Sequence, residues 1–121
     1  MSQKILICDD EESVRESFKS ILGDYYELIL TENGEQCLSC LDHGKDIGLV
    51  FLDIKMSKIN GRDVLRLMKE NHPDMKVIVV NDYKSVKTAG EASYPGASSC
   101  IVKPFKAEEI LASVKKELNK L

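Results

Sequence analysis

Three acidic residues and one lysine follow short apolar runs in this chain. Asp9 and Asp10 come directly after the first apolar run. Asp53 ends a run in the middle of the chain, and Lys103 ends the last one. If these runs are parallel strands, their carboxyl ends meet at one edge of the sheet, where ligands bind in open α/β proteins. Three carboxylates converging there repel one another and raise at least one pKa unless a cation joins them.

The cation that fits such a group of carboxylates is Mg²⁺. It takes oxygen ligands, binds one or two carboxylates directly and keeps water or phosphate oxygens at its other positions. An aspartate that faces the metal, with Lys103 opposite, is well placed to attack phosphorus, because both cations stabilise charge on the equatorial oxygens. We therefore predict that Asp53 forms an aspartyl phosphate, a known product of carboxylate nucleophiles.

Each of these residues also has a simpler, structural interpretation. An aspartate at a strand end is usually a helix cap, and Asp10 or Glu11 would favour the N-terminus of a following helix. A Lys-Pro pair is a common turn. These interpretations do not explain why four separate runs end in polar residues, the fourth at Asn81 and Asp82. We therefore favour a shared site.

The elements that position these residues alternate along the chain. Five continuous apolar runs predict strands that are buried on both faces, which is typical of a parallel sheet between two layers of helices. The runs are Ile5–Cys8, Leu28–Leu30, Leu49–Leu52, Val77–Val80 and Ile101–Val102. Amphipathic patterns between the runs predict helices, and Asn33-Gly34 and Asn60-Gly61 mark turns or helix starts. Right-handed crossovers then give an open, doubly wound α/β sheet.

The weakest of the expected helices is the fourth, at residues 84–95. This segment contains Gly90, Ser93 and Pro95 and few large apolar side chains. We expect it to be short or mobile, because glycine and proline both disfavour a helix.

Length and charge limit the classes of protein to which the chain can belong. The 121 residues fit one domain, covering 1–121. With 17 basic and 20 acidic residues the net charge is −3, so no basic face indicates direct binding of nucleic acid. No apolar run approaches membrane-spanning length, and Met1–Lys4 leads straight into a strand-like run without a signal peptide. These features predict a cytoplasmic protein that does not enter the membrane.

The four cysteines do not indicate a disulfide framework, because a protein without an export signal keeps its thiols reduced. Cys37 and Cys40 form a C-x-x-C pair inside a helical stretch. We interpret them as part of a buried helix face rather than as a redox or metal site. His43 and His72 have no ligand-spaced partners and are expected at the surface, at the ends of helices.

Three segments of the chain resemble the response-regulator receiver family of two-component signalling, and the resemblance covers essentially the whole chain. Residues 5–12 (ILICDDEE) resemble its first strand and acidic pair, and residues 49–61 (LVFLDIKMSKING) its phosphoacceptor strand and loop. Residues 96–105 (GASSCIVKPF) resemble the approach to its Lys-Pro-Phe motif. The resemblance implies a five-stranded parallel sheet, doubly wound as (βα)5, with the flavodoxin-like strand order 2-1-3-4-5 of chemotaxis regulators.

The resemblance also implies a role for each acidic residue of the site. Asp53 is the phosphoacceptor. Asp10 and Asp53 bind Mg²⁺ together with the backbone carbonyl of Lys55, while Asp9 acts mostly through water. The cofactor is therefore expected to be Mg²⁺.

In the same resemblance Lys103 contacts the phosphoryl group, and the peptide bond before Pro104 is cis. The phosphodonor is a phosphohistidine on a histidine kinase or phosphotransfer protein. Phosphorylation alters a protein-binding face made by the fourth helix, fifth strand and fifth helix. That face is expected to bind an output domain or a downstream protein, and a homodimer could form through it. Such a domain is not an enzyme and promotes only its own phosphorylation and dephosphorylation.

Four positions depart from the family pattern. Asn81 stands where Thr or Ser binds a phosphoryl oxygen, and Asp82 stands where Ala or Gly leaves room for the phosphate. The charge of Asp82 is unfavourable there unless its side chain turns outward. Cys100 replaces an aromatic residue that moves inward on activation, and Ser57 replaces a proline of the phosphoacceptor loop. We infer that phosphoryl chemistry is kept while its relay has changed. The alternative is a degenerate receiver that binds partners without phosphorylation.

Two other classes of protein with a similar sheet fit poorly. A flavodoxin needs a phosphate-binding loop rich in Ser, Thr and Gly after its first strand, where this chain has four acidic residues. A phosphatase of the haloacid dehalogenase type needs a second aspartate two residues after the first, and Lys55 occupies that place.

Overall fold

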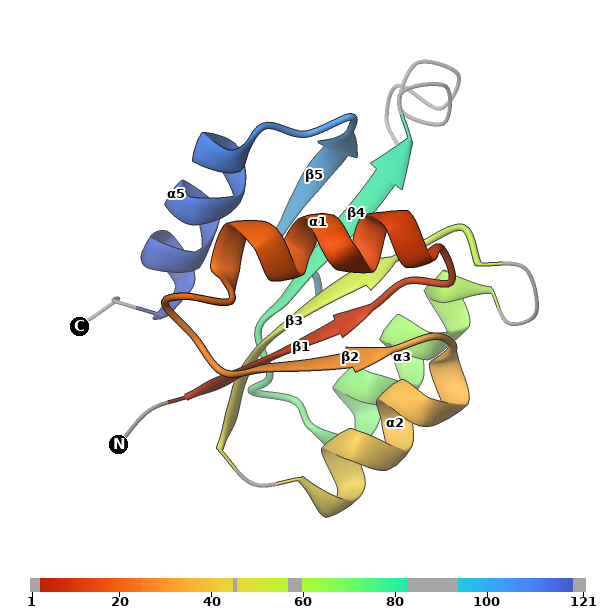
Figure 1. The fold of residues 1–121 in the computed structure, drawn as a ribbon. Coiled ribbons are helices and arrows are strands. Elements are labelled where there is room, and N and C mark those ends of the chain that lie inside the picture. The colour runs from red at the N-terminus through yellow and green to blue at the C-terminus, as the bar shows by residue number, and fades with distance from the viewer. Residues whose placement is uncertain (1–2, 45, 57–59, 83–93, 119–121) are drawn as a thin grey trace.

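The structure, a computed structural model, describes residues 3–44, 46–56, 60–82 and 94–118. Its elements form one parallel sheet with helices on both faces (Figure 1). In chain order they are β1 (Lys4–Cys8), α1 (Glu12–Leu22), β2 (Leu28–Thr31), α2 (Gly34–His43), β3 (Ile47–Asp53), α3 (Gly61–Asn71), β4 (Val77–Asp82), β5 (Ser99–Lys103) and α5 (Ala107–Leu118). Ser57 and most of the fourth helix expected at 84–95 lie outside the described residues.

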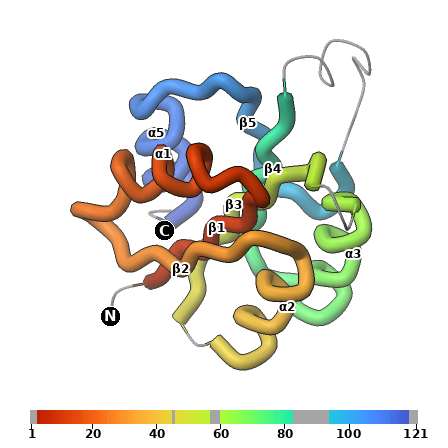
Figure 2. The backbone as a smooth tube through the Cα atoms, turned by 45° about the vertical axis from the view of Figure 1, so that its right-hand side comes forward, coloured from red at the N-terminus to blue at the C-terminus, as the bar shows by residue number. Residues whose placement is uncertain are grey.

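The strands lie in the order β2-β1-β3-β4-β5, and every neighbouring pair is parallel. This confirms the predicted flavodoxin-like order and the predicted doubly wound α/β sheet. Helices α1 and α5 cover one face of the sheet, and α2 and α3 cover the other (Figure 2). None of the helices in the described ranges is long and apolar enough to cross a membrane.

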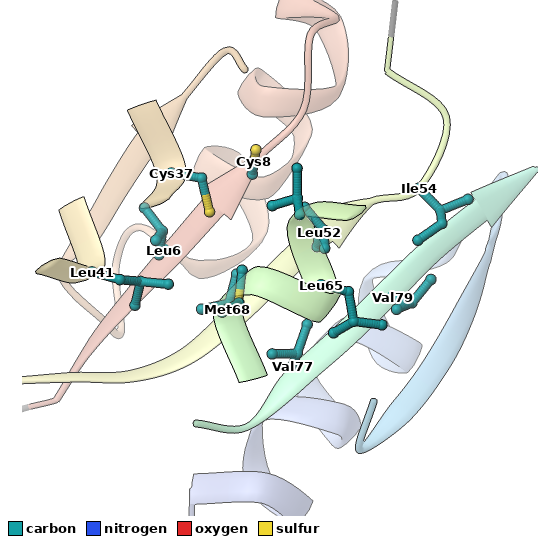
Figure 3. Close-up of a cluster of buried hydrophobic side chains, with 12 residues drawn as sticks. Leu6, Cys8, Cys37, Leu41, Leu52, Ile54, Leu65, Met68, Val77 and Val79 are labelled. Atoms are coloured by element: carbon teal, nitrogen blue, oxygen red, sulfur yellow. The ribbon is translucent and has the colours of Figure 1, made fainter. Parts of the chain in front are cut away.

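Side chains alternate along each strand between two hydrophobic cores. The α2/α3 core consists of Leu6, Cys8, Cys37, Leu41, Val50, Leu52, Ile54, Val64, Leu65, Met68, Val77 and Val79 (Figure 3). The α1/α5 core consists of Ile5, Ile7, Phe18, Leu22, Leu49, Phe51, Ile78, Val80, Ile101, Ile110 and Val114. The same alternation decides to which face of the sheet the side chain of a residue at a strand end points.

The C-x-x-C pair lies on α2, and its thiols are free. Cys37 is fully buried in the α2/α3 core near Cys8 (Figure 3), and Cys40 is partly buried. Contact with the Cys8 thiol, followed by burial, raises the pKa of the Cys37 thiol, which keeps it protonated. The prediction of a buried helix face is therefore confirmed. His43 ends α2 and His72 follows α3, as expected.

Asparagine side chains start α2 and α3. Oδ1 of Asn33 and Oδ1 of Asn60 each accept a hydrogen bond from a backbone N–H in the first turn, at 2.9 and 2.8 Å. Both predicted turn positions are thus helix starts. Gly61 begins α3 against the end of β3, where its N–H donates to the Ile54 carbonyl at 3.1 Å. A Cβ atom on Gly61 would lie 2.5 Å from the Cα of Ile54, so only glycine fits without a shift of the backbone.

We expect Gly61→Ala to lower the free energy of unfolding by about 1–3 kcal/mol, because its methyl group meets the backbone of Ile54 at the end of β3. Urea denaturation followed by circular dichroism measures the change. Glu16→Ala, at an exposed position of α1, is the control and should change the value by less than about 0.5 kcal/mol. An equal free energy of unfolding in the parent and Gly61→Ala would contradict the close packing of α3 on β3.

Candidate functional site

The carboxyl ends of β1, β3 and β5 bring predicted site residues to one edge of the sheet. Asp9 follows β1, Asp53 ends β3 and Lys103 ends β5. Carboxylate oxygens of Asp9, Asp10 and Asp53 lie within 4.8 Å of one another. Nζ of Lys103 lies 3.1 Å from Oδ2 of Asp9 and 3.5 Å from Oδ2 of Asp53. Because β4 lies between β3 and β5, the lysine reaches Asp53 only through the length of its side chain.

Backbone N–H groups hold both buried carboxylates in place. Oδ1 of Asp9 accepts a hydrogen bond from the Glu11 N–H at 2.9 Å, and Oδ1 of Asp53 accepts one from the Lys55 N–H at 3.1 Å. In each case the donor lies two residues further along the chain, so the carboxylate is held by the turn that follows its own strand. This arrangement leaves Oδ2 of both residues on the side of Lys103.

Burial makes the charges of this site unfavourable. Asp9 is 1% exposed and Asp53 is 4% exposed. Burial, followed by the negative charge of Asp9, raises the pKa of Asp53 to about 6, although Lys103 opposes the shift. Burial also raises the pKa of Asp9 above its usual range. Burial alone would lower the pKa of Lys103, but the carboxylates of Asp53 and Asp9 outweigh it and raise the pKa overall.

The donor set of the site fits a hard cation. Oδ2 of Asp9 is completely buried and accepts no hydrogen bond from the described residues, although Lys103 forms an ion pair with it. Together with Asp10 and Asp53 it makes the one group of three or more metal-ligating side chains found in the described ranges. Clustered carboxylate oxygens, one of them without a hydrogen bond, are the kind of ligands that Mg²⁺ prefers.

The atypical positions lie at the carboxyl end of β4 and on β5. Asn81 is buried, with Oδ1 accepting a hydrogen bond from the Asp82 N–H at 3.0 Å and Nδ2 donating to the hydroxyl of Tyr94. The carboxylate of Asp82 is half-exposed and forms an ion pair with Nζ of Lys55 at 3.3 Å. That pair offsets the charge that we expected to oppose a phosphoryl group. Cys100 is exposed on β5.

Two residues near the site were not predicted from the sequence. Nη1 of Arg15 donates to the backbone carbonyl of Asp9 at 2.8 Å and so ties α1 to the end of β1. A basic residue in the first turn of a helix that follows an acidic pair is a signal that could have indicated it. No spacing indicates the contact between Tyr94 and Asn81, because it joins side chains from different parts of the fold. The peptide bond before Pro104 is cis, as the family resemblance predicted.

Comparison with known protein sequences agrees with this geometry. Residues 5–115 match the family model of the response regulator receiver domain. The alginate biosynthesis transcriptional regulatory protein AlgB of Pseudomonas syringae pv. tomato is 31% identical over 115 residues, which cover 95% of this chain and 26% of AlgB. The response regulator MprA of Mycobacterium bovis is 31% identical over 116 residues, which cover 95% of this chain and 50% of MprA. The chain thus spans between a quarter and a half of the length of these relatives.

Solved structures share the fold over nearly the whole chain. A CheY-like response regulator receiver domain protein from Methanospirillum hungatei JF-1 superposes with a TM-score of 0.87 at 28% identity, covering 98% of this chain and 95% of that one. The response regulator TrrA from Thermotoga maritima, crystallised in complex with Mg²⁺ and BeF, gives a TM-score of 0.84 at 34% identity. That match covers 96% of this chain and 99% of TrrA.

The raised pKa of Asp53 predicts how stability depends on pH in metal-free protein. Between the ordinary value of 3.8 and about 6, the folded protein keeps a proton on Asp53 that the unfolded chain has lost. The free energy of unfolding should therefore fall as pH rises through this window. We expect Asp53→Asn, which removes this penalty, to stabilise the protein at neutral pH by about 3 kcal/mol, and progressively less as the pH falls through the window.

Urea denaturation in EDTA, repeated from about pH 4 to pH 8, tests this expectation. Asp74→Asn, at an exposed position after α3, is the matched control and should follow the parent at every pH. If Asp53→Asn stabilised the protein equally at the two ends of this range, the gain would not come from the charge of Asp53.

Proposed function

The chain belongs to the response regulator receiver domain family, and we propose that Asp53 is its phosphoacceptor. The observation that carries the proposal is the meeting of Asp9, Asp10 and Asp53 with Lys103 at the carboxyl edge of the sheet. The family to which the chain belongs works in two-component signalling. The proposed donor is therefore a phosphohistidine on a histidine kinase or a phosphotransfer protein.

Asp53 acts in this proposal as a nucleophile. One of its carboxylate oxygens attacks phosphorus while the bond from phosphorus to the imidazole nitrogen of the donor breaks. The product is an aspartyl phosphate, and the released imidazole takes up a proton from water. A pKa of about 6 leaves Asp53 mostly ionised at neutral pH, which the attack requires. The hydrogen bond from the Lys55 N–H to Oδ1 orients the carboxylate so that Oδ2 faces Lys103.

Positive charge on both sides of the phosphoryl group completes the proposed site. Lys103, which already lies between two carboxylates, contacts the phosphoryl oxygens once the group is on Asp53. When bound, Mg²⁺ supplies further positive charge against the same oxygens. We propose that Asp10, Asp53 and the backbone carbonyl of Lys55 hold the ion directly and that Asp9 acts through water. The crystallisation of TrrA with Mg²⁺ and BeF supports Mg²⁺ as the cofactor.

The consequence of phosphorylation is proposed to be a change in a protein-binding face. An output domain or a downstream protein is the proposed recipient, and the greater length of AlgB and MprA supports an attached output domain. Of the face made by the fourth helix, β5 and α5, the structure describes the two last elements. A homodimer through that face and a cytoplasmic location stay predictions. We propose one receiver domain over residues 1–121, active only in its own phosphorylation and dephosphorylation.

A second candidate function is binding of partners without phosphorylation. The observation that favours it is the burial of Asn81 against Tyr94, together with the exposure of Cys100. Asn81 lacks the hydroxyl, and Cys100 lacks the aromatic ring, that the family pattern uses to relay phosphorylation. The intact acidic site speaks against this candidate, because a domain used only for contacts has no need of two buried carboxylates beside a lysine.

Incubation with Mg²⁺ and acetyl phosphate, followed by intact mass measurement, tests the proposed function. We expect one phosphoryl adduct on the parent, lost at high pH as an acyl phosphate is, and no adduct on Asp53→Asn. Omission of Mg²⁺ should also abolish the adduct, because the uncompensated carboxylates then repel the donor.

Asp63→Asn, an exposed substitution in the first turn of α3, serves as the matched control and should be phosphorylated like the parent. A parent that gives no adduct and binds no Mg²⁺ would favour partner binding without phosphorylation. An adduct that persists in Asp53→Asn would move the acceptor to another residue.

A further inference from the structure

The side chain of Asn81 is anchored at both of its polar atoms. Its Oδ1 accepts a hydrogen bond from the Asp82 N–H at 3.0 Å, and its Nδ2 donates to the hydroxyl of Tyr94. The residue is 1% exposed, so these two partners take the place of water. A buried amide held in this way has one preferred orientation, because leaving a polar atom unpaired would be unfavourable.

The alternation of β4 directs this amide away from the phosphoacceptor. Val77 and Val79 occupy alternate positions of β4 with Asn81, so the three side chains point to the same face. Val77 and Val79 lie in the α2/α3 core, and Tyr94 packs against that core. Asp53 lies two residues after Phe51 on β3, and Phe51 points into the α1/α5 core on the other face. Because side chains at successive positions of a strand point to opposite faces, Asn81 and Asp53 address opposite sides of the sheet.

Tyr94 is itself held from a second side. The guanidinium of Arg62, in the first turn of α3, lies over its ring with 4.6 Å to the ring centroid. This is within the range of a cation–π contact. Tyr94 also begins a turn in which its carbonyl accepts a hydrogen bond from the Ala97 N–H at 2.9 Å. The ring that presents its hydroxyl to Asn81 therefore has a second contact, on its face.

We propose that Tyr94 is a positioning residue that holds the Asn81 amide away from Asp53, so that Tyr94 and a phosphoryl group on Asp53 compete for it. The proposal rests on the proposed function, since the phosphoryl group is the competitor. To donate to a phosphoryl oxygen, the amide must rotate off the tyrosine hydroxyl towards the other face of the sheet. Occupation of the acceptor site then releases Tyr94, and the coupling is reciprocal: whatever holds Tyr94 weakens binding at Asp53.

The competing arrangement is a bridge. An amide nitrogen carries two N–H groups, so it is able in principle to donate to Tyr94 and to a phosphoryl oxygen at once. In a bridge, Tyr94 supports binding at Asp53 and its loss weakens binding. In competition, loss of the hydroxyl strengthens binding. The sign of the effect therefore separates the two arrangements.

The first test is the affinity of the full chain for beryllofluoride in saturating Mg²⁺, measured by calorimetry. Tyr94→Phe, which removes one hydroxyl and keeps the ring under Arg62, should bind about 2- to 10-fold more tightly than the parent. Asn81→Ala should bind more weakly than the parent. Adding Tyr94→Phe to Asn81→Ala should then change nothing further, because the two residues act through one contact.

Tyr26→Phe is the matched control, because this partly buried tyrosine packs against the α1/α5 core on the other face and should leave the affinity unchanged. Equal or weaker binding by Tyr94→Phe would overturn the proposal. So would a gain in affinity that persists in the background of Asn81→Ala.

A second measurement does not depend on any variant binding beryllofluoride. In the parent labelled with 3-fluorotyrosine, the fluorine resonance of Tyr94, assigned by its loss in Tyr94→Phe, should shift when Mg²⁺ and beryllofluoride are added. A stationary Tyr94 resonance at full occupancy would sink the inference and leave the proposed function standing. A parent that binds neither Mg²⁺ nor beryllofluoride and gains no phosphoryl adduct would overturn both.

Discussion

The site depends on the placing of two buried carboxylates, Asp9 and Asp53, beside a single ammonium, that of Lys103. These two carboxylates hold more negative charge than one lysine neutralises, and burial raises the pKa of both. Two turn N–H groups restrain the carboxylates without removing the excess. A site in this state is sensitive to any ligand that changes its charge, whether a divalent cation or a phosphoryl group.

A parallel sheet provides the scaffold that holds these unfavourable charges together. It brings the carboxyl ends of β1, β3 and β5 to one edge, while two apolar cores hold the strands from both faces. Close contacts at the edge add precision: α3 starts directly on the backbone of Ile54, and Arg15 binds the carbonyl of Asp9. The charged residues therefore sit on rigid elements and not on long loops.

The same sheet places Asp53 and Asn81 on opposite faces. Asp53 belongs to the side of the α1/α5 core, whereas Asn81 belongs to the side of the α2/α3 core and meets Tyr94 there. In the relay that we propose, the amide of Asn81 and the hydroxyl of Tyr94 take the places of the hydroxyl and the aromatic residue of the family pattern. The ion pair of Lys55 with Asp82 partly neutralises the added negative charge at the end of β4.

The sequence by itself determined the sheet, its strand order through the family resemblance, and the acidic site. Continuous apolar runs specify strands buried on both faces, and the residue after each run must then lie at the carboxyl edge. The roles of Asn33 and Asn60 at helix starts were also predictable, because a capping residue binds the backbone of its own helix. Only the tertiary structure decided the partners of Asn81 and Asp82. Tyr94 and Lys55 reach them from other segments, and no periodicity of a strand or helix relates side chains that meet only after the chain has folded.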